Sequence, residues 1–296
     1  MAVVTRELAP PQAVATVGES RTLDLVLKIV AYVALVLFAL IMFVPFIFSV
    51  TTSLKTPAEA NQLLSLKGLF WPDQISFDAY REVLRSDIDR WFLNSAIVAA
   101  AWVVGRAFTA TTAGYAFARM QFPGRRILFL MILSTIIVPG IVKVVPQFIL
   151  LKDLHMLDSY WALTLPFLTD AFPIFLMKQF FESFPRELEE AARVDGASRY
   201  RIFAQIALPN AMPAVTAVAI FSFQGSWNWF LEPVIFISSA HLRTMPLGLA
   251  YFYKAHYTDW PTLMAIAVLS TVPIAIFYLI FQRWFVEGQS RSGIKG

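Results

Sequence analysis

The residues between 183 and 210 carry the most specific spacing in this 296-residue chain. An acidic residue precedes two small ones at Glu190-Ala191-Ala192, and Gly196 stands six positions after Glu190. Small side chains let another surface approach a helix backbone closely, and glycine permits a turn that most residues resist. Leu188 and Asp195 continue the same helical face. The pattern predicts a short docking helix, one face of which contacts a partner protein. The alternative is a solvated amphipathic connector without a partner.

Four ionisable residues lie inside otherwise apolar segments: Arg106, Lys143, Asp170 and Glu232. Charges are costly in lipid, so they turn inward or find partners. Counted along the helices, Arg106 lies at a depth near Asp170, and Lys143 at a depth near Glu232 or Asp170. We predict at least one such ion pair. Two interpretations stay open: pairing between helices or with a partner subunit, and a role for Lys143 and Asp170 in ligand passage.

A third group combines hydrogen-bonding side chains with flat rings at Gln224, Trp227, Asn228 and Trp229. Sugars stack their C–H faces on such rings while their hydroxyls need polar partners. These residues are therefore candidates for a substrate pathway. Helix packing and interfacial anchoring of the aromatic side chains are the alternative.

Catalytic chemistry has weak support. His155, His241 and His256 lack metal-ligand spacing, there is no Cys, and no nucleophile and base can be paired. A Gly-x-x-x-x-Gly-Lys-Ser/Thr loop is also absent from the sequence, so the chain cannot cradle ATP in that manner. We therefore expect no catalytic residue and no metal site.

The elements that must position these groups are membrane helices. The chain is 58% hydrophobic and 15% charged, with a mean hydropathy of +0.63, unlike a soluble domain of this length. Hydrocarbon about 30 Å thick requires about 20 apolar residues per helix, and in lipid each helix satisfies its own backbone. We predict an all-α polytopic membrane protein with six spans, at about 25–50, 91–118, 127–150, 159–182, 211–236 and 262–285. Prolines within the spans predict bent helices around a cavity.

The distribution of the 24 Lys and Arg residues predicts the orientation. With the N-terminus inside, the inner segments hold more of these residues than the outer ones, which favours both termini in the cytoplasm. The net charge of +4 then reflects topology and needs no nucleic acid. The predicted organisation is a cytoplasmic tail (1–24), a first span (25–50), an extracytoplasmic cap with short helices (51–90), a five-span core (91–285) containing the cytoplasmic loop 183–210, and a cytoplasmic tail (286–296).

The spacing Glu190-Ala191-Ala192, Gly196, Ile206, Leu208-Pro209 resembles the coupling-loop signature of permease subunits in bacterial ABC importers. The likeness extends over nearly the whole chain and resembles the carbohydrate-uptake branch, in particular the six-span subunit of maltose-type systems. Further motifs that carry it are Thr52-Ser53-Leu54-Lys55-Thr56-Pro57, Asn94-Ser95, Ala116-Phe117-Ala118-Arg119, Phe122-Pro123-Gly124-Arg125, Gly225-Ser226-Trp227-Asn228, Gln282-Arg283 and Gly293-Ile294-Lys295-Gly296. Trp229 and Glu232 depart from the residues common in the family.

This resemblance implies a type I ABC importer permease fold in the bacterial cytoplasmic (inner) membrane. It implies a second permease as heterodimer partner, an ATPase dimer that binds ATP and Mg²⁺, and an extracytoplasmic sugar-binding protein. Residues 198–208 would form a second short helix leading into the fifth span. The ATPase-coupling residues would be Glu190, Ala191, Ala192, Asp195, Gly196, Ile206, Leu208 and Pro209. The last outer loop would contact the binding protein through Tyr251, Tyr253, His256 and Tyr257, or these would form a membrane-interface belt.

Two other function classes stay open at this point. One is a proton-coupled secondary transporter that works through Asp170. The other is a membrane-embedded enzyme acting on lipid-linked sugars, with Asp87 and Asp89 as candidates. Both would be active as a lone chain, whereas the importer subunit requires partners.

Overall fold

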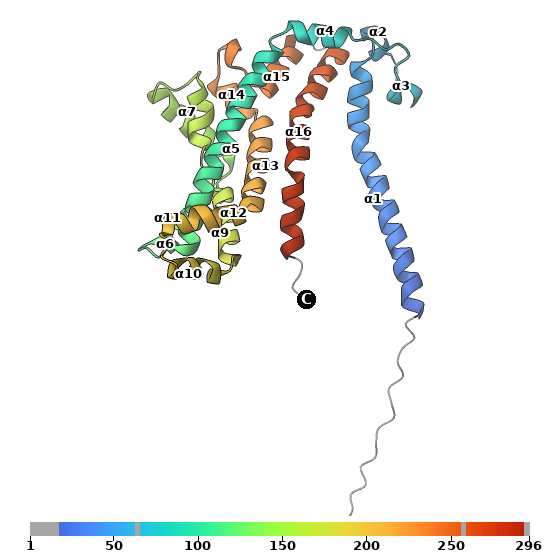
Figure 1. Ribbon diagram of the computed structural model, residues 1–296. Helices are drawn as coiled ribbons and strands as arrows, with labels where there is room; N and C mark the ends of the chain where they lie inside the picture. Colours follow the sequence, from blue (N-terminus) through green and yellow to red (C-terminus); the bar gives the residue numbers. More distant parts are fainter. Residues whose placement is uncertain (1–17, 63–65, 256–258, 293–296) are drawn as a thin grey trace, which may run out of the picture. The chain divides into compact units, whose positions relative to one another are not determined.

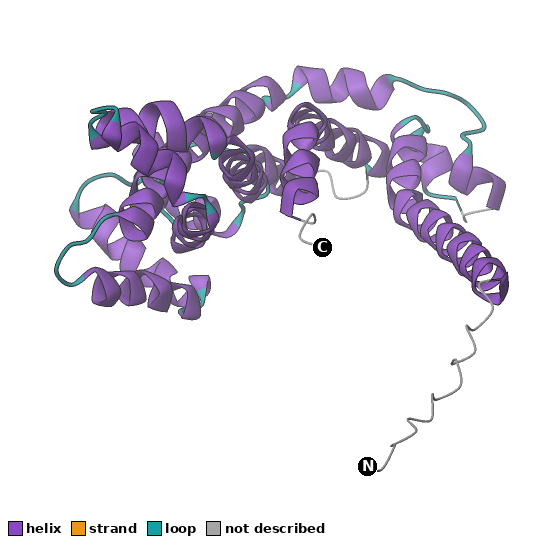
Figure 2. Cartoon of the chain, turned by 60° about the horizontal axis from the view of Figure 1, so that its bottom comes forward, coloured by secondary structure: helices purple, strands orange, loops and turns teal. Residues whose placement is uncertain are grey.

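The computed structural model describes residues 18–62, 66–255 and 259–292, and every regular element in these ranges is helical (Figures 1 and 2). The all-α prediction is therefore confirmed for the described ranges. In chain order the elements are α1 (Gly18–Ser53), α2 (Pro57–Ala60), α3 (Leu66–Phe70), α4 (Asp78–Arg85), α5 (Ile88–Arg119), α6 (Arg125–Ile137), α7 (Gly140–Asp153), α8 (Tyr160–Thr164), η1 (Leu165–Phe167), α9 (Ala171–Ser183), α10 (Arg186–Val194), α11 (Arg199–Ile202), η2 (Phe203–Ala207), α12 (Leu208–Asn210), α13 (Met212–Trp227), α14 (Leu231–Phe236), η3 (Ala240–Leu242), α15 (Met245–Ala255) and α16 (Trp260–Ser292).

The described residues fall into two units, which divide between Phe48 and Ser49. The described part of the first unit is α1 up to Phe48. Its most apolar stretch has a mean hydropathy of 2.9 and none of that stretch is buried. A helix of this length that exposes apolar side chains on all sides fits a hydrocarbon environment.

Four helical stretches in the described ranges are long and apolar enough to cross a membrane: Leu23–Ser53, Ile88–Arg119, Tyr160–Ser183 and Trp260–Gln282. Two bent helix pairs bring the total to six if each pair is one span. Six spans were predicted, but the predicted fifth span, 211–236, is interrupted, because α13 ends at Trp227 and α14 begins at Leu231. The pair α6 and α7 bends by 104° around Pro139, and the pair Arg199–Asn210 and Met212–Trp227 bends by 71°. The predicted segment 127–150 is thus not one straight helix.

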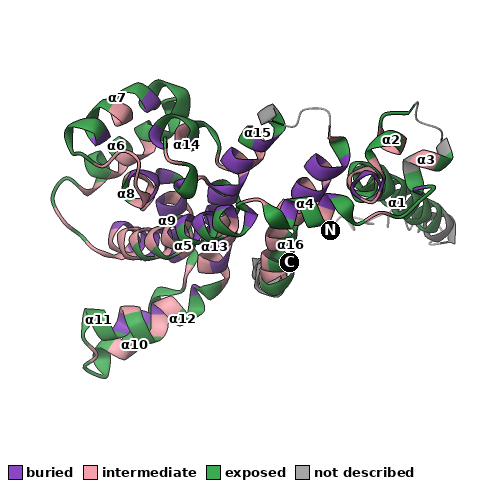
Figure 3. Ribbon diagram, turned by 90° about the horizontal axis from the view of Figure 1, so that it is seen from above, coloured by how far each residue is buried: buried purple, intermediate pink, exposed green. Residues whose placement is uncertain are grey.

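The centre of the second unit is α5, which packs against both α9 and α13, while α13 also packs against α16. Buried residues lie where α5, α9 and α13 meet, and others lie on α4 and α15 (Figure 3). A Cβ added at Gly114 of α5 would lie 2.6 Å from the Cβ of Met177 and 2.9 Å from the backbone nitrogen of Lys178. The absence of a side chain at Gly114 therefore lets α5 and α9 approach backbone to backbone.

The other end of α5 is joined to the loop that precedes α15. The amide of Asn94 donates to the carbonyl oxygens of His241, at 2.9 Å, and Arg243, at 2.8 Å. The Ser95 hydroxyl accepts from the backbone N–H of Met245 at 2.7 Å. Because all three are side chain to backbone contacts, they fix the loop to α5 whatever side chains the loop carries.

Three short helices occupy the segment 51–90, as predicted from its composition. Of these, α4 packs against α16, and its Ala79 and Val83 join a buried cluster with Ile88 and Trp91. Lys55 is only 4% exposed, and its ammonium group donates to the Gly68 carbonyl at 2.6 Å. That bond ties the start of the segment to α3.

Asp158 fastens the α7–α8 loop to the loop after α14. Its carboxylate accepts from the backbone N–H groups of Ser238 and Ser239, at 3.0 and 2.9 Å, and from the Ser239 hydroxyl. Its own N–H donates to the Phe236 carbonyl at 2.9 Å. The Ser239 hydroxyl bond, followed by the Ser239 N–H bond, lowers the pKa of Asp158 below its ordinary value of 3.8.

We predict that this connection weakens in acid. A carboxyl group whose pKa is lowered by folding stabilises the fold above its ordinary value, and the contribution is lost as the pH falls through the lower folded value. Thermal unfolding in detergent, followed by tryptophan fluorescence, should therefore show stability decreasing as the pH drops below 3.8. Asp158→Asn keeps an acceptor oxygen and tolerates the positive φ of 54° at this position, but it cannot titrate. If the variant and the wild type lost stability in parallel, another group would be responsible.

Candidate functional site

The helix α10 presents the small-residue face and ends in a glycine turn, as the spacing predicts. The N–H of Ala197 donates to the Ala192 carbonyl at 2.9 Å, and the N–H of Gly196 donates to the Arg193 carbonyl at 3.1 Å. This is the Schellman arrangement, which requires a left-handed residue directly after the cap. Gly196 has φ 79°. The way the helix terminates thus favours glycine at this position.

The second short helical run follows directly. The Ser198 hydroxyl caps α11 by accepting from the Arg201 N–H at 3.4 Å, and η2 then continues as a π-helical turn into α12. Ile202 and Ala207 are buried, whereas Ile206 and Leu208 are half-buried and Pro209 is exposed. Ala207 joins the buried cluster that also contains Ala110, Phe117 and Phe181 of α5 and α9. The run therefore packs against the core before α13 begins.

The inner face of α10 holds a buried ion pair with the end of α5. The Glu189 Oε1 lies 3.0 Å from the Arg119 Nε, and the two side chains are only 7% and 6% exposed. The Arg119 Nη2 also donates to the Phe184 carbonyl. Removing one partner of a buried pair leaves an uncompensated charge and is strongly destabilising. The pair therefore fixes the position of α10 against α5.

Tyr115 connects four elements at the same place. Its hydroxyl donates to the Glu189 Oε2 at 3.3 Å. Its ring centroid lies 5.3 Å from that of Phe181 in α9 and 4.9 Å from that of Phe203 in η2. Displacement of α10 or η2 would thus be transmitted through one aromatic side chain to α5 and α9.

The outer face of the hairpin formed by α10 and α11 is open. Glu190, Ala191 and Asp195 are exposed and Ala192 is half-buried. Three large apolar side chains are also exposed here: Leu188 (48%), Val194 (88%) and Tyr200 (88%). Small residues bordered by exposed apolar ones form a surface suited to contact with another protein.

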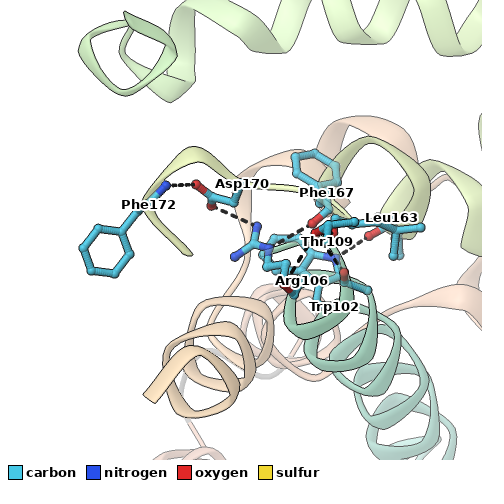
Figure 4. Close-up of polar contacts among 9 residues, drawn as sticks. Trp102, Arg106, Thr109, Leu163, Phe167, Asp170 and Phe172 are labelled. Atoms are coloured by element: carbon cyan, nitrogen blue, oxygen red, sulfur yellow. Dashed lines mark hydrogen bonds and ion pairs between the residues drawn. The ribbon is translucent and has the colours of Figure 1, made fainter. Parts of the chain in front are cut away.

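A second feature lies between the spans, where Arg106 is held by several groups (Figure 4). The Arg106 Nη2 lies 3.3 Å from the Asp170 Oδ2, its Nε donates to the Phe167 carbonyl at 2.9 Å, and its guanidinium lies 4.0 Å from the centroid of the Trp102 ring. Asp170 also caps α9 by accepting from the Phe172 N–H at 3.1 Å. The predicted pairing of Arg106 with Asp170 is confirmed.

Lys143 and Glu232 line the same cavity of about 560 Å³ together with this pair. Within the described ranges neither forms an ion pair; Glu232 instead accepts from the indole N–H of Trp229. The Trp229 ring lies 4.4 Å from that of Phe167 and 4.8 Å from that of Trp102, measured between centroids. Of the predicted pathway residues, Lys143 and Asp170 line this cavity, and Trp229 contacts its lining residues Glu232 and Phe167.

The other three pathway candidates lie elsewhere. Trp227 is buried (3% exposed), donates to the Ser270 carbonyl at 2.9 Å and packs edge-on against Phe92. Gln224 and Asn228 are exposed, and neither lines the cavity around Asp170. Trp227 thus has the surroundings of a packing residue, the alternative that the sequence left open.

Of the four residues predicted in the last outer loop, two can be placed, and both lie within the helix α15 and not in a loop. Tyr251 is 44% exposed with the Arg243 guanidinium 3.7 Å from its ring centroid, and Tyr253 is 49% exposed. His256 and Tyr257 lie outside the described residues.

Sequence reasoning missed the inner face of α10. Neither Glu189 nor its partners Arg119 and Tyr115 were among the residues expected to couple α10 to the spans. The sequence signal for this pairing was Arg119, which ends a long apolar segment at the same predicted membrane boundary as Glu189 of the docking helix. Periodicity within a single helix cannot reveal such a pairing, because it depends on which helices are neighbours.

The family of binding-protein-dependent transport system inner membrane components matches residues 110–291 of this chain. The chain is 32% identical over 269 residues to an arabinooligosaccharides transport system permease protein of Bacillus subtilis, covering 89% of this chain and 96% of that protein. A diacetylchitobiose uptake system permease protein of Streptomyces coelicolor is 32% identical over 260 residues, with 86% and 84% covered.

The chain is also similar in fold to a solved structure over most of the length of both chains. A chain from a bacterial ABC transporter involved in the import of the acidic polysaccharide alginate superposes with a TM-score of 0.77 at 26% identity. The match covers 88% of this chain and 97% of that one. The family match at residues 110–291 includes the end of α5 and all of α9, α10 and α13.

Proposed function

Since this chain belongs to the family of binding-protein-dependent transport system inner membrane components, we propose that it is a non-catalytic permease subunit that moves a sugar or related polyol across the bacterial cytoplasmic membrane. Its energy comes from a separate ATPase dimer, which holds ATP and Mg²⁺. The observation that carries the proposal is the two-sided character of α10. One side is anchored by the buried Glu189–Arg119 pair, and the other exposes small and apolar residues.

The exposed side of α10 is the surface that contacts the ATPase. Ala191 and Ala192 let its surface come close to the helix backbone, and Leu188 and Val194 supply apolar contact. When the ATPase subunits close on ATP, they displace α10. The ion pair and Tyr115 pass this movement to α5, while η2 and α12 pass it to α13. The result is alternating access of a central pathway.

The remaining partners follow from the same proposal. A second, different permease completes the pathway, and an extracytoplasmic binding protein delivers the sugar near Tyr251 and Tyr253. Both termini lie in the cytoplasm, consistent with the distribution of Lys and Arg. The names of the relatives support the substrate class, since they describe transport of arabinooligosaccharides and uptake of diacetylchitobiose.

Purification of the affinity-tagged chain from its own membrane tests this function. We expect an ATPase and a second permease to copurify in stoichiometric amounts. In proteoliposomes, sugar uptake should require ATP on the side of the membrane that carries the ATPase. It should also require the binding protein. Uptake driven by a proton gradient with the chain alone, or turnover of a lipid-linked sugar, would contradict the proposal and favour one of the two other function classes.

A further inference from the structure

A cavity of about 360 Å³ lies between the end of α5, the α5–α6 turn, α10 and α11. Five of its lining residues are arginines from these separate elements: Arg119, Arg125, Arg186, Arg193 and Arg199. The acidic lining residues are Glu189 and Glu190. Five guanidinium groups against two carboxylates leave an excess of three positive charges around one space.

The excess is not relieved by other side chains. Glu189 is already paired with Arg119, and within the described ranges Arg125, Arg186, Arg193 and Arg199 form no ion pair with an acidic side chain. Like charges brought together repel one another, and because Arg186, Arg193 and Arg199 are exposed, water screens part of this repulsion. A bound anion would attract each of these guanidinium groups and so offset their mutual repulsion.

Arg119 supplies a second, independent observation. Its side chain is 6% exposed, and its buried Nη1 has no hydrogen-bond partner among the described residues. A buried donor without a partner is rare because it has lost its water without replacement. Guanidinium groups bind phosphate oxygens bidentately and in clusters.

We propose that this cavity binds a phosphate group, and that the chemistry fits the phosphate of an anionic phospholipid headgroup. Arg119 is the last residue of a candidate membrane span, which places the cavity at the level where headgroups lie. Basic pockets of this kind between membrane helices bind anionic headgroups. Bound there, the headgroup bridges α5 and α10 beside the Glu189–Arg119 pair. The inference adds to the proposed function without requiring an ATPase contact.

The test uses the full-length chain without its ATPase, so that a failure here is distinct from a failure of the proposed function. The chain is placed in phosphatidylcholine nanodiscs with or without phosphatidylglycerol, and retained lipid is counted by native mass spectrometry after transfer to detergent. Inorganic phosphate is titrated separately in lipid-free detergent. The variant Arg193→Gln/Arg199→Gln removes two lining charges. The control Arg126→Gln/Arg201→Gln removes the same charge from two arginines that do not line the cavity.

We expect the wild type and the control to retain phosphatidylglycerol and the lining variant to bind it at least about tenfold more weakly. Binding of inorganic phosphate with the same dependence on Arg193 and Arg199 would support the site and identify free phosphate as a second source. Equal loss in both variants would show nonspecific attraction and overturn the proposal. The proposal would also fail if the wild type bound neither probe, or if the assembled importer filled the cavity with ATPase carboxylates.

Discussion

Gly196→Val is expected to reduce ATP-driven uptake by at least about tenfold while the chain still inserts into the membrane. Gly196 has φ 79° and closes the Schellman turn after α10. Residues with a Cβ cost about 1–3 kcal/mol in such a conformation, and β-branched ones lie at the upper end. No atom lies within 4 Å of a Cβ built at Gly196, so the effect comes from the backbone and not from a clash. The measurement compares ATP hydrolysis and sugar uptake in proteoliposomes.

Two controls separate the turn from general strain. Gly196→Asn should retain most uptake, because asparagine tolerates the left-handed region. Gly124→Val imposes a matching strain at φ 77°, again with no atom within 4 Å, but at the start of α6 instead of the end of α10. Normal uptake by Gly196→Val, or equal losses in both valine variants, would remove support for the coupling role of this turn.

Glu189→Ala is expected to give the largest loss of stability, about 3–5 kcal/mol, because it leaves the Arg119 charge buried without its partner. Tyr115 loses its acceptor in the same variant. The adjacent substitution Glu190→Ala removes an equal charge from an exposed position and should change stability by less than about 1 kcal/mol. Thermal unfolding in detergent measures both, and hydrolysis-coupled uptake shows whether α10 still transmits movement.

A double-mutant cycle assigns the loss to the pair itself. Replacing both partners with apolar residues, Arg119→Met with Glu189→Leu, should recover a large part of the stability, since no charge is then left buried. The buried pair would not hold α10 in place if Glu189→Ala and Glu190→Ala were equally mild. The same would follow if the stability lost by the double variant equalled the sum of the losses in Arg119→Met alone and Glu189→Leu alone.

The parts of the fold that local rules determine could be predicted from the sequence. Hydropathy located the helical stretches because each must satisfy its backbone within about 20 residues. Gly196 was predicted at a turn because few other residues fit there. The pairing of Arg106 with Asp170 followed from depth, since a rise of about 1.5 Å per residue converts sequence position into height.

The features that were not predicted depend on the direction in which a side chain leaves its helix and on which helices are neighbours. Depth alone matched Lys143 with Glu232 equally well, yet Glu232 accepts from Trp229 instead. Trp227 and Trp229 are two residues apart, but Trp227 is buried and donates to the Ser270 carbonyl of α16, whereas Trp229 donates to Glu232, which lines the cavity. A bend in the segment 127–150 was predicted from its prolines, but the size of the bend, 104°, depends on what surrounds the break.

The contacts at the two ends of α5 have a mechanical consequence. Tyr115 meets the hairpin at one end, and Asn94 holds the loop before α15 at the other. Their sequence separation of 21 residues corresponds to about 32 Å of helix. Over that length a tilt of about 5° moves the far end by roughly 3 Å, close to the length of one hydrogen bond. A stiff rod fastened at both ends would let a small push on one side of the bilayer break or remake individual bonds on the opposite side.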